Sequence, residues 1–159
     1  MKVIYKDYKG GDLLILDMEI CSFKQQLHNL FAERLGCGSM RLVDRTTGKL
    51  LASEVELADT FWRRFRGLML RGKFQQGKAL LFKFSKPGRH GVHMWFVRFS
   101  IDLVYLDSSF KVVELRAQLK RWRFYRPRAT VSYLIELPAG TISRARVEVG
   151  HEISLEGKR

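Results

Sequence analysis

A succession of short apolar segments separated by turn-forming residues constrains the fold of this chain more than any other sequence feature. The segments begin at Ala79, are rich in β-branched and aromatic residues, and predict strands over 79–84, 92–99, 101–106, 111–119, 131–137 and 153–155. Turn-forming pairs such as Pro87-Gly88 separate them. Strands this short and numerous bury their apolar faces by closing on themselves or by stacking in layers. The sequence therefore predicts a mainly β fold with minor α structure.

The chain is long enough for one core of this kind, and its first 40 residues follow a different pattern. A length of 159 residues with 46% hydrophobic side chains suits one ordinary domain. Apolar-rich strands at 2–8 and 13–20 flank Gly10-Gly11, and apolar residues at helical spacing follow at 22–36. We therefore predict an N-terminal hairpin-helix extension, residues 1–40, and a β domain, residues 41–159.

Two more elements are expected between the extension and Ala79. Residues 41–44 and 50–57 are predicted to form a hairpin around the turn at 45–48. Residues 59–69 are predicted as a short helix, because four apolar residues share one of its faces: Phe61, Phe65, Leu68 and Met69.

The sequence predicts no cofactor, no metal centre and no membrane span. Cys21 and Cys37 flank the predicted helix 22–36, which holds them too far apart for a disulfide. Neither belongs to a Cys-x-x-Cys pair. The first residues contain no apolar run long enough for a leader or a transmembrane segment, so we expect a soluble, cytoplasmic protein.

Positive charge is concentrated after Met40. The chain carries 29 Lys and Arg against 16 Asp and Glu, a formal net charge of +13. Ten basic residues and no acidic residue lie between Asp59 and Asp102, and the segment from Arg116 to Arg128, both included, holds six more basic residues. This balance favours an anionic partner, which is a nucleic acid, an acidic protein or an anionic surface.

The segment 120–128 interleaves aromatic rings with basic side chains. Single-stranded nucleic acids are held in this way, by stacking on rings and neutralisation of the backbone. Trp122 and Phe124 are the predicted stacking platforms, and alternatively they fill one end of the β body while the arginines stay in solvent. No RNA-recognition, KH or helix-turn-helix signature accompanies the segment. The predicted anion-binding residues are Arg63, Arg64, Arg66, Arg98, Lys120, Arg121, Arg123, Arg126 and Arg128.

A different interpretation places a pocket for a small molecule near residues 92–99. Aromatic walls with a few polar groups are typical of such pockets, and the candidate lining residues are His93, Met94, Trp95 and Asp102. In a regular strand, Met94 would share one face with Phe96, and Trp95 would lie on the other face.

The same region also permits two chemical interpretations. In a hydrolase, His93 is the general base, Asp102 orients it, and Ser100 or Ser132 is the nucleophile. No Gly-x-Ser-x-Gly elbow supports this chemistry. Alternatively, two histidines supply half of a metal site, completed by Asp102 or His151: the pair is His90 and His93.

Three ordered stretches carry a family resemblance: RGLM at 66–69, HMWFVRFSIDLVYLD at 93–107 and YLIELPAG at 133–140. They resemble the domain of unknown function 192 family, also called uncharacterised protein family 0127, over about residues 50–155. The resemblance implies a compact β-barrel or jelly-roll-like sandwich with one or two short helices. It implies no activity, because none is established for the family. Residues 1–40 have no counterpart in it, and we expect them to pack on the domain or to contact a protein partner.

We therefore predict a non-catalytic binding module for an anionic partner. The alternative is a small-molecule binder or hydrolase with its pocket around His93, Trp95 and Asp102. The binding-module hypothesis requires that folding gathers basic residues from distant stretches into one electropositive face.

Overall fold

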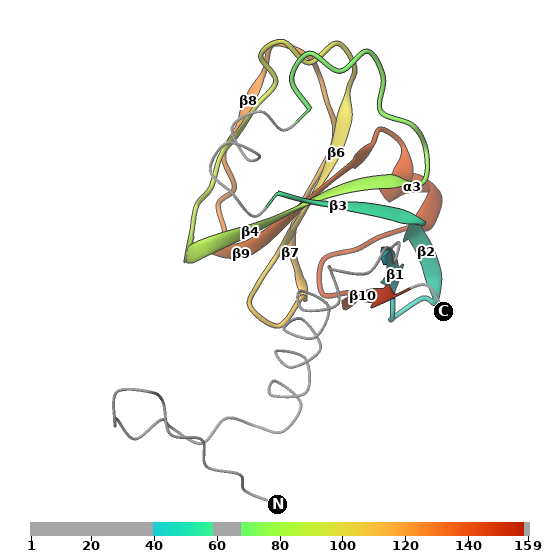
Figure 1. Ribbon diagram of the computed structural model, residues 1–159. Helices are drawn as coiled ribbons and strands as arrows, with labels where there is room; N and C mark the ends of the chain where they lie inside the picture. The colour runs from blue at the N-terminus through green and yellow to red at the C-terminus, as the bar shows by residue number, and fades with distance from the viewer. Residues whose placement is uncertain (1–39, 59–67, 158–159) are drawn as a thin grey trace, which may run out of the picture. The chain divides into compact units, whose positions relative to one another are not determined.

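The computed structural model describes residues 40–58 and 68–157 (Figure 1). The predicted extension up to residue 39 and residues 59–67 of the predicted short helix lie outside the described residues. Within them, the chain forms β1 (Met40–Asp44), β2 (Lys49–Ala52), β3 (Glu54–Ala58), β4 (Lys78–Gly88), β5 (Val92–His93), β6 (Ile101–Leu106), β7 (Val112–Leu119), β8 (Phe124–Tyr125), β9 (Val131–Pro138), α3 (Thr141–Ala145) and β10 (Ile153–Gly157). The prediction of a mainly β fold with minor helix is confirmed.

The described strands belong to three separate sheets. A central sheet has the order β3-β4-β9-β6-β7, a second has the order β10-β1-β2, and β5 pairs with β8 alone. All pairs are antiparallel except β3 and β4, which run parallel. None of these sheets closes on itself, so the barrel or jelly-roll geometry implied by the family resemblance stays a prediction.

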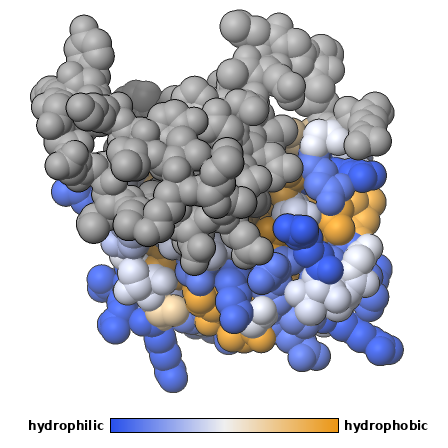
Figure 2. All heavy atoms as spheres, turned by 90° about the horizontal axis from the view of Figure 1, so that it is seen from below, coloured by the Kyte–Doolittle hydropathy of each residue, from blue (hydrophilic) through white to orange (hydrophobic). Residues whose placement is uncertain are grey.

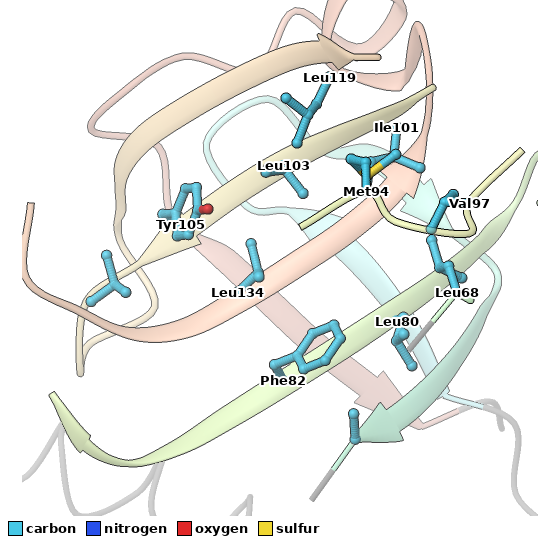
Figure 3. Close-up of a cluster of buried hydrophobic side chains, with 12 residues drawn as sticks. Leu68, Leu80, Phe82, Met94, Val97, Ile101, Leu103, Tyr105, Leu119 and Leu134 are labelled. Atoms are coloured by element: carbon cyan, nitrogen blue, oxygen red, sulfur yellow. The ribbon is translucent and has the colours of Figure 1, made fainter. Parts of the chain in front are cut away.

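The central sheet is covered on both faces. All six residues of β6 are buried, and successive side chains of a strand point to opposite faces. The apolar cluster on one face joins the sheet to the segments beside its edge, because Leu68, Met94 and Val97 pack with the strand residues Leu103 and Tyr105 (Figure 3). These loop residues therefore anchor the exposed turns described below.

The strand predicted at 50–57 is wrong at its centre, where the chain bends at Ser53. The Gly77 carbonyl accepts backbone hydrogen bonds from Ser53, at 2.8 Å, and Glu54, at 3.0 Å. The residues before the bend form β2 and pair with β1, as the predicted hairpin requires. The residues after it form β3 and pair with β4 in the central sheet. One apolar run thus supplies strands to two sheets.

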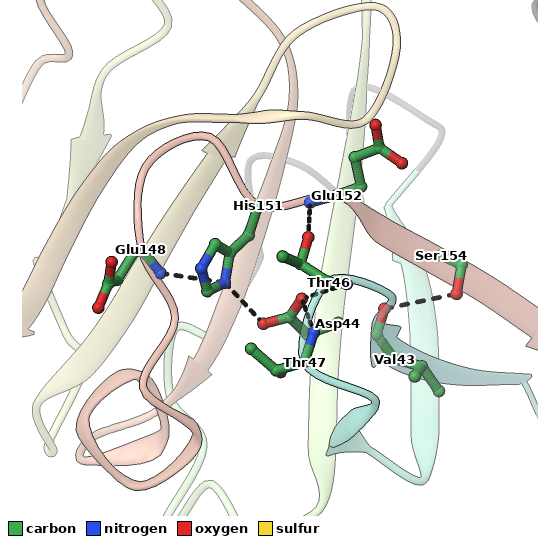
Figure 4. Close-up of polar contacts among 8 residues, drawn as sticks. All are labelled: Val43, Asp44, Thr46, Thr47, Glu148, His151, Glu152 and Ser154. Atoms are coloured by element: carbon green, nitrogen blue, oxygen red, sulfur yellow. Dashed lines mark hydrogen bonds and ion pairs between the residues drawn. The ribbon is translucent and has the colours of Figure 1, made fainter.

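The turn between β1 and β2 is fastened to the segment before β10 by a carboxylate and an imidazole (Figure 4). The Nδ1 of His151 lies 2.8 Å from Oδ2 of the buried Asp44, whose Oδ1 accepts backbone N–H bonds from Thr46 and Thr47. Burial raises the pKa of Asp44, but the hydrogen bonds from His151 and Thr47 and the charge of His151 outweigh it and lower the pKa.

A short helix that was not predicted, α3, follows β9. Its first turn is fixed by Asp102 of β6, whose Oδ2 accepts a 2.9 Å hydrogen bond from the backbone N–H of Ile142. Oδ1 of the same carboxylate accepts from the backbone N–H of Gln118, at 2.8 Å. Gln118 has φ 50° and lies where the β6–β7 register shifts, so Asp102 satisfies an N–H at an irregularity of the ladder.

Candidate functional site

The loop before β6 and the loop after β7 lie at the same end of the central sheet, opposite the β6–β7 turn (Figure 1). The β5–β8 pair joins these loops. Its ladder continues through Met94, whose N–H donates to the Arg123 carbonyl at 2.8 Å and whose carbonyl accepts from Trp122 at 3.2 Å. The Met94 side chain is fully buried. We call this end of the domain, residues 92–98 and 120–126 with the turn at 68–71, the loop end.

The prediction of a strand over 92–99 is wrong beyond His93, because a tight turn follows. The Val97 N–H lies 3.4 Å from the Met94 carbonyl, and Phe96 has φ 60° at the third position of this turn. Met94 and Val97 are therefore buried together, while Trp95 and Phe96 are exposed at the turn. Strand alternation had predicted that Met94 and Phe96 share a face.

Two neighbouring segments also hold a bulky residue at a positive φ. Leu70 has φ 61° in the turn closed by a 3.3 Å hydrogen bond between the Arg71 N–H and the Leu68 carbonyl, and Trp122 also has φ 61°. Leu70, Phe96 and Trp122 are 73%, 53% and 61% exposed, respectively. We call these three side chains the apolar tip.

Direct contacts connect the members of the apolar tip. The Leu70 N–H donates to the Phe96 carbonyl at 3.0 Å, and the ring of Phe96 meets the ring of Trp122 edge to face, with centroids 5.7 Å apart. A bulky residue in the left-handed region costs about 1 to 2 kcal/mol relative to a right-handed conformation. Strain of this kind is concentrated at functional sites. The loop end is the best candidate site, because it holds three such residues that face solvent and are linked through Phe96.

Two more exposed aromatic side chains border the apolar tip. Trp95 stacks on His93, with ring centroids 5.0 Å apart. Phe124 lies opposite His93 in the β5–β8 pair, and a Cβ built on Gly91 would come within 2.6 Å of its ring. Phe124 therefore covers Gly91 and leaves its other side in solvent. Neither predicted stacking platform, Trp122 or Phe124, is buried as a plug.

Exposed basic residues neighbour these rings along the chain. Lys120, Arg121 and Arg123 flank Trp122 in the sequence, and all three are exposed. Arg98 follows the turn at 94–97, and Arg126 donates from Nε to the Arg89 carbonyl at 3.4 Å. Five residues of the predicted anion-binding set lie in the loop end: Arg98, Lys120, Arg121, Arg123 and Arg126. None of them forms a salt bridge with another residue of 40–58 or 68–157. Their charges are thus available to a ligand.

The last basic residue of the segment is held in place through its backbone. Glu114 of β7 accepts hydrogen bonds from the N–H groups of Arg128 and Ala129 and from the Tyr125 hydroxyl. Burial raises the pKa of Glu114, but these hydrogen bonds and the charge of Arg128 lower it overall. The remaining predicted anion-binding residues, Arg63, Arg64 and Arg66, lie outside the described residues.

The residues of the predicted pocket have different polar surroundings, and the buried Nδ1 of His93 has no hydrogen-bond partner in the described residues. Both carboxylate oxygens of Asp102 accept backbone N–H bonds, whereas His93 stacks on Trp95. The four candidate metal ligands are also separated: His90 stacks on Phe84, and His151 binds Asp44. Within the described residues, no three His, Cys, Asp or Glu side chains converge as a metal site.

Comparison with known proteins identifies the family. A family model, DUF192, described as "Uncharacterized ACR", matches residues 42–155, from β1 to β10. The chain belongs to the DUF192 family. The resemblance seen in the three sequence motifs is therefore confirmed.

Curated relatives of this DUF192 chain carry the name UPF0127 protein. One from Thermococcus sibiricus is 39% identical over 115 residues, which cover 72% of this chain and 74% of the relative. One from Pyrococcus furiosus is 39% identical over 114 residues, which cover 70% of this chain and 95% of the relative.

Two solved structures share the fold. A Sinorhizobium meliloti protein, described as a candidate transcription regulator, superposes with a TM-score of 0.66 at 26% identity, over 76% of this chain and 92% of that one. A Novosphingobium aromaticivorans protein of unknown function superposes with a TM-score of 0.65 at 17% identity, over 73% of this chain and 83% of that one.

The DUF192 motif at 133–140 contains a buried acid that the sequence analysis did not single out. Glu136 of β9 lies between Leu80 and Leu103 in the sheet, and its Oε2 has no hydrogen-bond partner. Burial raises its pKa to about 8, although the charge of Arg71 acts in the opposite direction. Arg71 itself forms a two-pronged ion pair with Glu56, at 2.7 and 2.9 Å. Burial thus favours the neutral form of Glu136, which belongs to the core.

Proposed function

We propose that this DUF192 domain is a non-catalytic binding module for an anionic partner, and that the loop end is its binding surface. The observation that carries the proposal is the exposed Trp122 between Arg121 and Arg123, with no carboxylate paired to either arginine in the described residues. Rings and unpaired guanidinium groups side by side suit a ligand with both charge and apolar or planar surface.

The division of charge among the described residues supports this surface. Two basic side chains elsewhere in the described residues pair with acids: Arg41 with Glu156 at 2.8 Å, and Lys78 with Glu54 at 3.2 Å. Such exposed pairs contribute little to stability, but they cancel charge locally. Apart from Arg71, which pairs with Glu56, the basic residues of the loop end form no ion pair within the described residues, so this surface attracts an anion more strongly than these paired positions do.

A cytoplasmic setting is part of the proposal, because nucleic acids and the anionic lipids of the inner leaflet are both found there. The name of the Sinorhizobium meliloti structure, a candidate transcription regulator, is compatible with a nucleic acid partner. None of the helical structure in the described residues has the length and apolarity that a membrane-spanning helix needs. The pocket alternative lacks a free carboxylate, because both oxygens of Asp102 accept hydrogen bonds from backbone N–H groups.

Chromatography on immobilised heparin tests the proposal without assuming the natural partner. We expect the double variant Arg121→Ala/Arg123→Ala to elute at clearly lower salt than the wild type, because two unpaired charges are lost from the binding surface. The matched control is Arg45→Ala/Lys49→Ala, which removes two exposed charges from the β1–β2 turn. Equal shifts in the two double variants would show that retention reflects net charge alone, and would overturn the proposal.

A further inference from the structure

We infer that the anionic partner of the loop end is a lipid surface, into which the apolar tip inserts while the surrounding basic side chains contact the headgroups. This inference rests on the proposed function, since it names the class of partner for the same surface. It depends on four features of the loop end: the apolar tip, the conformation of its backbone, the charges around it and the rigidity of the loops.

The composition of the apolar tip fits an acyl environment better than a nucleic acid base. Leu70, the most exposed of the three residues, has no ring on which a base can stack. Phe96 and Trp122 meet at an interplanar angle of 66°, so they do not form a parallel-sided slot for a planar base. An acyl layer, by contrast, accepts Leu, Phe and Trp side chains in any mutual orientation. Trp is also enriched at membrane interfaces.

The backbone places these side chains outside the core at a cost in stability. Leu70, Phe96 and Trp122 all have φ near +60°, a conformation that bulky residues rarely adopt. Glycine or asparagine would occupy these turn positions without the penalty. The same conformation at Phe110 holds a ring in the core, so the binding role is indicated by the positive φ together with the exposure of Leu70, Phe96 and Trp122.

The charges lie where a headgroup layer would meet the domain. Lys120, Arg121 and Arg123 are sequence neighbours of Trp122, and Arg98 follows the turn that carries Phe96. Juxtamembrane basic side chains are attracted to anionic leaflets, and apolar side chains beside them enter the boundary between headgroups and acyl chains. On the face seen from below, Figure 2 shows mostly hydrophilic side chains where described residues are drawn, with hydrophobic patches between them.

The loop end is also held together before any ligand arrives. Backbone hydrogen bonds join Met94 to Arg123 and Trp122, and join Leu70 to Phe96. Met94 and Val97 anchor the turn in the core cluster. Insertion therefore needs no refolding of the loops, and the ordering cost of binding is small.

Cosedimentation of the full chain with vesicles tests the inference, using phosphatidylcholine vesicles with and without phosphatidylserine. The decisive variant is Leu70→Asn/Phe96→Asn/Trp122→Asn, because asparagine tolerates the left-handed conformation and removes the apolar surface. We expect the wild type to bind only the vesicles that contain phosphatidylserine, and the triple variant to bind them at least about tenfold more weakly. Heparin retention of the variant is measured in parallel, because it reports on the basic residues, which the variant leaves intact.

The matched control is Leu50→Asn/Val149→Asn, which removes two exposed apolar side chains away from the loop end and should bind vesicles like the wild type. Unchanged vesicle binding by the triple variant, or equal loss in the control, overturns the inference. So does tip-dependent binding of a single-stranded oligothymidine without vesicle binding, which would assign a nucleic acid. A change in oligomeric state by light scattering in place of vesicle binding would assign the tip to contacts between copies. In each of these cases, heparin retention decides separately whether the proposed function stands.

Discussion

The carboxylate of Asp102 accepts a hydrogen bond of 2.9 Å from the backbone N–H of Ile142, which ties the start of α3 to the buried strand β6. The other carboxylate oxygen serves Gln118 in β7. One side chain therefore fixes the geometry of three elements, and its role is structural.

Replacement of Asp102 by Asn is expected to destabilise the domain by about 1 to 3 kcal/mol, because one of two buried N–H groups then faces an amide N–H. Urea unfolding followed by circular dichroism measures this loss. Asp107→Asn is the control, since Oδ1 of Asp107 also accepts two backbone N–H bonds, from Ser109 and Lys111, in the exposed β6–β7 turn. A cost for Asp102→Asn no larger than that of the control would contradict the role assigned to Asp102.

Glu136 is expected to make stability depend on pH between about 4.5 and about 8. Burial raises its pKa to about 8 in the folded chain, so it stays protonated there while the unfolded chain ionises it above about 4.5. The free energy of unfolding should therefore fall as pH rises through this window and level off above it. Glu136→Gln should lack this component and be more stable than the wild type above pH 8. Parallel pH profiles for the two proteins would show that Glu136 ionises as an ordinary surface acid does.

Falling pH is expected to lower the stability of the domain through the Asp44–His151 pair, whereas Glu136 lowers it as pH rises. The pKa of Asp44 is lowered on folding, so its contribution to stability is present above its ordinary value of 3.8 and is lost as pH falls below it. His151→Ala removes the main hydrogen bond that lowers the pKa of Asp44. We expect this variant to unfold at a higher pH than the wild type in an acid titration followed by tryptophan fluorescence, and an unchanged midpoint would refute the coupling.

Glycine should be better tolerated than alanine at the apolar tip. At Phe96 and Trp122, glycine adopts the left-handed conformation without the steric penalty that the Cβ of alanine causes. Each Gly variant should therefore exceed its Ala counterpart by about 1 kcal/mol in unfolding free energy. Thermal unfolding compares the pairs. At Leu50, an exposed strand position, the order should reverse, because glycine is the less favourable residue in a strand. If the Ala variant is the more stable one at Phe96 and Trp122 as well as at Leu50, strain at the tip is excluded.

The central strands were predictable because apolar content and burial agree there. Ile101–Leu106 and Val131–Pro138 are apolar runs bounded by turn residues, and both are strands of the central sheet. The helix α3 was not predicted, because five residues are too few to show a helical period. Its position depends on a contact with Asp102, forty residues earlier in the sequence.

The candidate site was predictable in part. The mixture of rings and arginines at 120–128 pointed to the exposed loop, because that signal is local. The apolar run at 92–99 was misread as a strand, since hydrophobicity carries no information about a positive φ at Phe96. Leu70 was missed for the same reason. Only the folded chain shows that Phe96 contacts both Leu70 and Trp122.

The slope of heparin affinity against salt tests the central claim most directly. For the wild type and Arg121→Ala/Arg123→Ala, the logarithm of the association constant is measured by titration calorimetry over a range of sodium chloride concentrations. Our account predicts a steep negative slope whose magnitude falls by roughly 1 to 2 in the variant, because two ion contacts are lost. Equal slopes for the two proteins would contradict the claim that the loop end is the anion-binding surface.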